Sequence, residues 1–146
     1  MVVKLEKIRF FPDTWRRGIF LFCGYLHFQS EKYKRMKVKE LVEKLDLQIF
    51  CGEENLDNEI KGGYASDLLS DVMGFAKEGH VWVTLQTHKN VIAIASLKEL
   101  AAIVLVKGNQ PEPDMLEQAR EEGIPVLGTA EQTFETVGRI YSLLNA

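Results

Sequence analysis

The stretch "HVWVTLQTHKNVIAIASLKELAAIVLVKG", residues 80–108, decides the fold. Its opening "HVWVTLQ" is rich in β-branched and aromatic residues and predicts a strand. Its closing "AAIVLVKG" is a short apolar run, typical of a buried strand, and the "THKNVIAIASLKEL" between them predicts a helix. A strand, a helix and a second strand with short links indicate two parallel strands joined by a right-handed crossover.

The same alternation continues toward the end of the chain. Residues 114–122 predict a helix that ends at Gly123, because glycine favours the left-handed turn that closes a helix. The apolar "IPVLG" at 124–128 predicts a third strand, and residues 129–144 predict a final helix. The buried face of that helix is expected to carry Phe134, Val137, Tyr141 and Leu144.

Shorter elements precede this half of the chain. Apolar residues at helical spacing predict a helix over "KVKELVEKL", residues 37–45, and "LQIFC" at 47–51 predicts a short strand. The glycine-containing "EIKGGYAS" at 59–66 predicts a weaker strand, followed by a helix in "DLLSDVMG". One face of that helix is expected to carry Leu68, Leu69, Val72 and Met73. We therefore expect an α/β fold, a layered parallel-sheet domain with a βαβαβα C-terminal half, preceded by a helix and short strands.

The first part of the chain has a different character, and we expect an extension over residues 1–35 and a domain over 36–146. The apolar run Ile19–Phe28 is about half of the roughly 20 residues that a membrane span needs, and no cleavage site for a signal peptide follows it. Three interpretations stay open: a hairpin or helix packed on the domain, a weak membrane-surface anchor, or a non-native extension with translation starting at Met36. The last is favoured, because a patterned helix begins directly after Met36.

Composition narrows the class of protein. The chain has 146 residues, enough for one domain with a hydrophobic core, and a net charge of −3, which argues against nucleic-acid binding. Its two cysteines, Cys23 and Cys51, form no CxxC pair and no disulfide framework, so a reducing, cytoplasmic setting is expected. Cys51 ends a strand and is expected to be a core residue.

The common catalytic patterns are missing from the sequence. The spans Gly74–Gly79 and Gly123–Gly128 have the glycine spacing of a phosphate-binding P-loop, but neither is followed by its lysine, and no GxGxxG follows a strand. His80 and His88 flank one strand at opposite ends, too far apart to share a metal ion. We therefore expect no catalytic residue, cofactor or metal, and neither a nucleic acid nor a membrane as partner.

Two aspartates in "GGYASDLLSDVMG", residues 62–74, allow two interpretations. Asp67 and Asp71 are four residues apart and project from one helix face, where paired carboxylates could divide acid and base roles. Alternatively, Ser66 or Asp67 caps the helix and Asp71 is solvated near its start, where the helix dipole favours a negative charge. The structural interpretation is favoured.

Topology gives a stronger argument for a site. Ligands of open parallel sheets bind beyond the carboxyl ends of the strands, where helix N-termini offer free N–H groups to anions. Polar residues follow three predicted strands there, and we expect a site for a small anionic ligand or nucleotide. Its expected residues are Gln86, Thr87, His88, Asn90, Lys107, Gly108, Asn109 and Thr129. Gly62, Gly63, Ser66, Asp67 and Asp71 are expected to border it.

One predicted helix also indicates a partner. "VIAIA", residues 91–95, is apolar on every side, which is typical of a helix buried on all faces. A homodimer would bury it, and symmetric dimers are the commonest oligomers. Cover by the N-terminal segment or by the first helix of the domain is the alternative.

Three stretches together resemble the DRTGG domain family: "GGYASDLLSDVMG", "HVWVTLQTHKNVIAIASLKELAAIVLVKG" and "EEGIPVLGTAEQTFETVGRIYSLL". The resemblance covers nearly all of residues 36–146 and implies the α/β fold expected above. The domain accompanies CBS pairs in some pyrophosphatase-like proteins and occurs in some phosphotransacetylases. It is similar to the N-terminal domain of HPr kinase/phosphorylase, whose kinase activity belongs to a separate P-loop domain.

The two motifs that name the family are altered in this chain. The Asp-Arg pair falls near His88-Lys89 and the Thr-Gly-Gly triplet near Val106-Lys107-Gly108, where only the last glycine is kept. The resemblance supports the location of the site, leaves its ligand open and carries over no agreed catalytic activity. Topology and resemblance together lead us to expect a regulatory domain without catalysis, which senses a small anionic metabolite or nucleotide. A dimeric interaction module without a ligand, or an acid–base enzyme that uses Asp67, Asp71 or His88, are the alternatives.

Overall fold

The computed structural model describes residues 34–146, so the expected extension lies outside the described residues except for Lys34 and Arg35. The strands are β1 (Met36–Lys37), β2 (Gln48–Cys51), β3 (Glu59–Ile60), β4 (Gly62–Ala65), β5 (His80–Thr84), β6 (Ala102–Leu105) and β7 (Val126–Gly128). The helices are α2 (Val38–Leu45), α3 (Leu69–Phe75), α4 (Asn90–Leu97), α5 (Pro113–Glu122) and α6 (Thr133–Leu144), with a short 3₁₀ turn at Glu53–Asn55.

A five-stranded sheet in the order β2-β7-β6-β5-β4 forms the centre of this domain. The strands β4 to β7 are parallel to one another, and β2 is antiparallel to β7 at one edge. Every residue of β6 is buried, as expected for a central strand that is covered on both faces. The expected parallel α/β architecture is confirmed, and β1 and β3 form a separate antiparallel pair.

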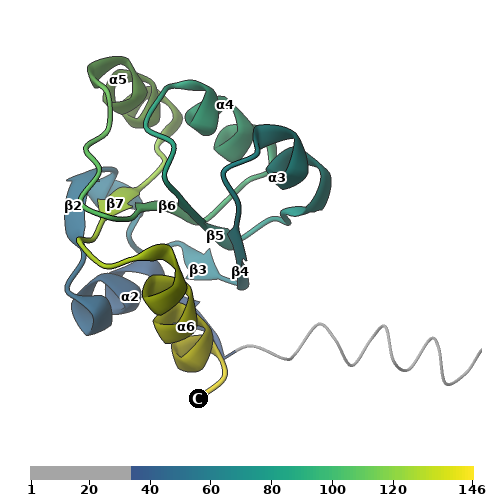
Figure 1. Ribbon diagram of the computed structural model, residues 1–146, viewed down its shortest axis with the longest axis vertical. Coiled ribbons are helices and arrows are strands. Elements are labelled where there is room, and N and C mark those ends of the chain that lie inside the picture. The colour runs from purple at the N-terminus through teal and green to yellow at the C-terminus, as the bar shows by residue number, and fades with distance from the viewer. Residues whose placement is uncertain (1–33) are drawn as a thin grey trace, which may run out of the picture. The chain divides into compact units, whose positions relative to one another are not determined.

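Helices cover the two faces of the sheet (Figure 1). On one face, Leu41 of α2 and Ile140 of α6 pack in one core cluster with Val104 of β6. On the other face, α3, α4 and α5 pack over a second cluster that contains Trp82 and Ile92. The crossovers through α3, α4 and α5 all run in the same direction along the sheet, so a common right-handed sense places these three helices on one face. The other face is covered by α2, which precedes β2, and by α6, which follows β7.

Cys51 is a buried member of the second core cluster, which confirms its predicted role. Its Sγ lies 3.9 Å from the carbonyl oxygen of Ile124, and burial raises the pKa of its thiol. A raised pKa disfavours the thiolate, so Cys51 is not activated as a nucleophile. Within residues 34–146, no helix has the length and apolar character that a membrane crossing requires.

The predicted buried faces of two helices are wrong in part. Phe134 and Tyr141 of α6 are 86% and 54% exposed, because the helix turns Thr136, Ile140 and Leu144 toward the sheet. The hydroxyl of Thr136 is satisfied in the core because it donates to the carbonyl oxygen of Gln132 at 2.9 Å. In α3, likewise, Val72 is buried as predicted, whereas Met73 is 48% exposed, and Leu68, the residue before the helix, is 64% exposed.

The apolar helix α4 lies between α3 and α5 (Figure 1). It buries Val91, Ile92 and Ala95 against the sheet, whereas Leu97 at its end is 69% exposed. The first helix of the domain, α2, packs on the opposite face and does not cover it, which excludes that alternative. Most of the burial of α4 therefore comes from its neighbours within the described domain.

Candidate functional site

Four loops leave the carboxyl ends of β4, β5, β6 and β7 and meet on the side of the sheet toward which these strands point. We call this side the carboxyl edge. The parallel register enforces this, because Thr84 pairs with Leu105 and Leu105 pairs with Gly128. The structure brings together at this edge the residues predicted to bind a ligand. They are Gln86, Thr87, His88, Asn90, Lys107, Gly108, Asn109 and Thr129.

Asp67 joins the first two of these loops. Its Oδ1 accepts hydrogen bonds from the Thr84 hydroxyl at 2.8 Å and from the Leu85 backbone N–H at 2.7 Å. Its backbone oxygen accepts a further bond from Nε2 of Gln86 at 3.3 Å. One carboxylate oxygen with two donors is an anchor between strand ends, so Asp67 has a structural role that differs from the predicted helix cap.

The other residues expected to border the site are distributed more widely. The N-cap of α3 is Leu68, whose N–H donates to the Ser66 hydroxyl at 3.2 Å, so neither Ser66 nor Asp67 occupies the cap. Asp71 accepts a hydrogen bond from the Tyr64 hydroxyl at 2.8 Å, which raises the pKa of Tyr64. Asp67 and Asp71 therefore engage different partners and do not form a catalytic pair.

Gly62 and Gly63 are not at this edge. Gly62 pairs with His80 at the first residue of β5, so both glycines lie toward the amino ends of the strands. The prediction that they border the site is wrong, because β4 is extended from Gly62 to Ala65 and carries them away from its carboxyl end.

Hydrogen bonds brace the remaining loops against one another. Asn109 donates from Nδ2 to the Leu85 carbonyl oxygen at 3.1 Å, and the Glu112 N–H donates to the Thr87 carbonyl oxygen at 2.9 Å. His88 places Nε2 at 2.8 Å from Oε1 of Gln86, while its Nδ1 is buried and has no partner in the described part of the chain. The edge is thus ordered by its own contacts.

A cavity of about 510 Å³ opens at this edge, beside the ends of β6 and β7. Gly108, Asn109 and Thr129 of the predicted set line it. Lys107 and Gly108 both adopt left-handed backbone conformations, with φ of 60° and 70°. Their N–H groups donate to the carbonyl oxygens of Glu131 and Thr129, each at 2.8 Å, which fixes the turn at the mouth of the cavity.

Several residues of this cavity are not among those predicted from the sequence. Leu45, Asp46, Gln48 and Phe50 come from the end of α2 and from β2, and Arg139 comes from α6. They reach the cavity because β2 pairs antiparallel with β7, so that the beginning of β2 lies at the carboxyl end of β7. The short strand "LQIFC" was visible in the sequence, but its place in the sheet was not.

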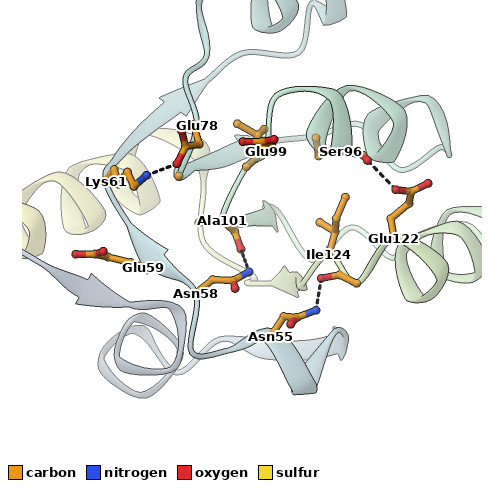
Figure 2. Close-up of a pocket in the computed structure, with 14 residues that line it drawn as sticks. Asn55, Asn58, Glu59, Lys61, Glu78, Ser96, Glu99, Ala101, Glu122 and Ile124 are labelled. Carbon is orange, nitrogen blue, oxygen red and sulfur yellow. Dashed lines mark hydrogen bonds and ion pairs between the residues drawn. The ribbon is translucent and has the colours of Figure 1, made fainter.

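A second cavity, of about 560 Å³, lies at the opposite edge of the sheet. Figure 2 shows four carboxylate side chains around it, with Lys61 pointing toward Glu78 and Ser96 toward Glu122. Because Lys61 already pairs with Glu78, the acidic lining disfavours an anion there. The carboxylates belong to Glu59, Glu78, Glu99 and Glu122.

Metal ligands do not gather in either place. Residues 34–146 contain no group of three or more His, Cys, Asp or Glu side chains arranged to hold a metal ion. At the edge of the sheet, His88 contacts an amide, and Asp67 is held by a hydroxyl and a backbone N–H. The site therefore offers hydrogen-bonding groups rather than a coordination shell.

The sequence of this domain matches a known family. The sequence model of the DRTGG domain matches residues 40–143, and the chain belongs to the DRTGG domain family. The family match spans more than half of the chain, which confirms the resemblance noted in the sequence. A comparison with curated proteins found no match.

A solved structure with a similar fold is the regulatory region of Clostridium perfringens pyrophosphatase, which comprises CBS and DRTGG domains. That structure is a complex with the activator diadenosine tetraphosphate. The two share 16% sequence identity with a TM-score of 0.59, over 74% of this chain and 47% of the other. The chain thus spans about half of that structure's length, and the likeness extends to the fold.

Proposed function

We propose that this chain is a non-catalytic regulatory domain that binds a small anionic metabolite or nucleotide at the carboxyl edge of its sheet. The observation that carries the proposal is the cavity of about 510 Å³ at the ends of β6 and β7. It lies where open parallel sheets bind ligands, and its volume is within the range of about 300–1,000 Å³ that ligand pockets occupy. Gly108, Asn109 and Thr129 line it, and Lys107 is exposed beside it.

Further observations support a regulatory rather than a catalytic role. Asp67 and Asp71, the two carboxylates considered as an acid–base pair, are engaged in separate hydrogen bonds. The DRTGG domain of the Clostridium perfringens protein belongs to a regulatory region, crystallised with a nucleotide activator. A domain that binds without turnover would act by changing the stability or assembly of the protein of which it is a part.

Thermal unfolding of the full chain tests the proposal. The unfolding midpoint is measured with inorganic phosphate, ribose 5-phosphate and the four nucleoside 5′-monophosphates. A ligand present at a hundred times its Kd stabilises the folded state by about 2.7 kcal/mol. Lys107→Ala should reduce the shift, and Lys61→Ala, at the opposite edge, should leave it unchanged. If none of these compounds moves the midpoint, the proposal fails.

A dimeric interaction module is the second candidate, and a distinct observation favours it. Among residues 34–146, six large apolar residues are exposed, and four of these belong to α3, to the residue before it, or to α4. Since α3 and α4 are in contact, these side chains could form one dimer surface. The four residues are Leu68, Met73, Phe75 and Leu97.

A further inference from the structure

The charges around the carboxyl-edge cavity are nearly balanced. Asp46 and Glu131 are its acidic residues and Arg139 is its basic residue among those that line it. Arg139 pairs with Glu131 through Nη1, and its Nη2 lies 3.5 Å from the carbonyl oxygen of Lys44. No uncompensated positive charge therefore faces the cavity from the described residues, so a bare phosphate would gain little inside it.

Phe50 supplies an aromatic wall. It is the extra residue of a bulge in β2, since Ile49 pairs with Leu127 and Cys51 pairs with the preceding Val126. Such bulges often redirect a side chain near a binding site. A Cβ atom on Gly128 would lie 2.4 Å from Cε2 of Phe50, so the absence of a side chain there leaves room for the ring. The half-buried ring is thus fixed in place and lines the cavity.

Three amide side chains line the same cavity as this ring. Asn109 donates from Nδ2 to Leu85, and Gln110 donates from Nε2 to the carbonyl oxygen of Gly108 at 3.3 Å. Among the described residues, neither amide oxygen accepts a hydrogen bond, and Gln48 contributes a third amide from the exposed start of β2. Amides both donate and accept, which suits the mixed donor and acceptor edge of a nucleobase.

We propose that the cavity binds the base of a nucleotide, stacked on Phe50 with its edge toward Asn109 and Gln110, while the phosphate lies outside near Lys107. This inference rests on the proposed function and specifies its ligand. Lys107 is exposed next to Gly108, and it forms no ion pair within residues 34–146. The aromatic ring, the amide side chains and the lysine outside the cavity together match a nucleobase that carries a charged group.

Isothermal titration calorimetry on the full chain separates the base from the phosphate. The probes are the 5′-monophosphates of adenosine, guanosine, cytidine and uridine, with ribose 5-phosphate and inorganic phosphate as base-free references. Stacking of a base on an aromatic side chain is worth about 1–3 kcal/mol, or roughly fivefold to a hundredfold in affinity. At least one nucleotide should therefore bind at least about fivefold more tightly than ribose 5-phosphate.

Two variants locate the base. Phe50→Leu keeps an apolar side chain over Gly128 and should abolish the advantage of the nucleotide over ribose 5-phosphate. The matched control, Phe75→Leu on the exposed surface of α3, should leave it unchanged. Should Phe50→Leu fail to fold by circular dichroism, Gln110→Ala, at an exposed position, provides the test, and it should weaken the nucleotide but not ribose 5-phosphate.

The outcomes distinguish this inference from the proposed function. Equal binding of ribose 5-phosphate and all four nucleotides overturns the base site and leaves an anion site intact. A nucleotide preference that survives in folded Phe50→Leu or, where that variant does not fold, in Gln110→Ala also overturns the base site. If none of the six probes binds, both the inference and the proposed function fail.

Discussion

Replacement of Asp67 tests whether the carboxyl edge is held together as the structure indicates. Asp67→Ala removes the acceptor for the Thr84 hydroxyl and for the Leu85 N–H. Hydrogen bonds to a charged group contribute about 1.5–3 kcal/mol each, but Asp67 is exposed and water will replace part of that. Thr84 is only 1% exposed, so water cannot easily replace the lost partner of its hydroxyl, and most of the free-energy cost of that lost hydrogen bond remains. We expect a net loss of about 2 kcal/mol.

Chemical denaturation of the full chain measures this loss, and the thermal midpoint should fall by about 8 °C for a domain of this size. Asp67→Asn keeps Oδ1 as an acceptor, so its loss of stability should be less than half of that of the alanine variant. Asp71→Ala, which removes only the part-buried bond from the Tyr64 hydroxyl, is the matched control and should cost less than Asp67→Ala, because it breaks one hydrogen bond rather than two. If the free energy of unfolding of Asp67→Ala lies within about 0.5 kcal/mol of that of the parent chain, the anchoring role of Asp67 is refuted.

Three further predictions concern the same domain. Burial lowers the pKa of His80, and the nearby charges of Lys77 and Lys98 lower it further. The neutral imidazole therefore contributes to folding stability above the unfolded pKa of about 6.5, and this contribution is lost as the pH falls through the lower pKa of the folded state. His80→Asn should flatten the pH dependence of the thermal midpoint between pH 7.5 and 5, and an unchanged slope would exclude this role. Gly52→Ala should destabilise the domain by more than about 2 kcal/mol in denaturant titrations, because φ is 82° and the new Cβ would lie 2.5 Å from the backbone Cα of Pro125; near-native stability would contradict this. Leu97→Glu should convert a dimer to a monomer in light scattering if α4 forms the interface, and a monomeric parent chain would count against the dimer.

The central architecture could be predicted because its signals are local. The strands β5 and β6 are short apolar runs joined by a helix with short links, and this pattern is typical of parallel strands that are covered on both faces. The site edge followed from the same argument, since parallel strands must end together. Asp67 was assigned to the helix start, but its bonds to Thr84 and Leu85 depend on a neighbouring strand.

The remaining details depend on packing between distant segments. In α6, two adjacent stripes have helical spacing, and only the contact with the sheet selects Ile140 over Tyr141. The pairing of β2 with β7 places Phe50 beside Gly128, a contact between residues 78 positions apart in sequence. The local sequence does not determine either of these contacts. The sequence therefore predicted the edge at which the cavity lies but not all of the residues that line it.

The central claim is that a small anionic ligand binds at the carboxyl edge of the sheet. Backbone amide chemical shifts, followed during titration with the nucleoside 5′-monophosphates, test it most directly. The account predicts that the largest changes fall on Gly108, Asn109 and Thr129, around the cavity at β6 and β7. Changes concentrated on Gly79 and Gly123, which line the acidic cavity at the other edge, or no changes at all, would contradict it.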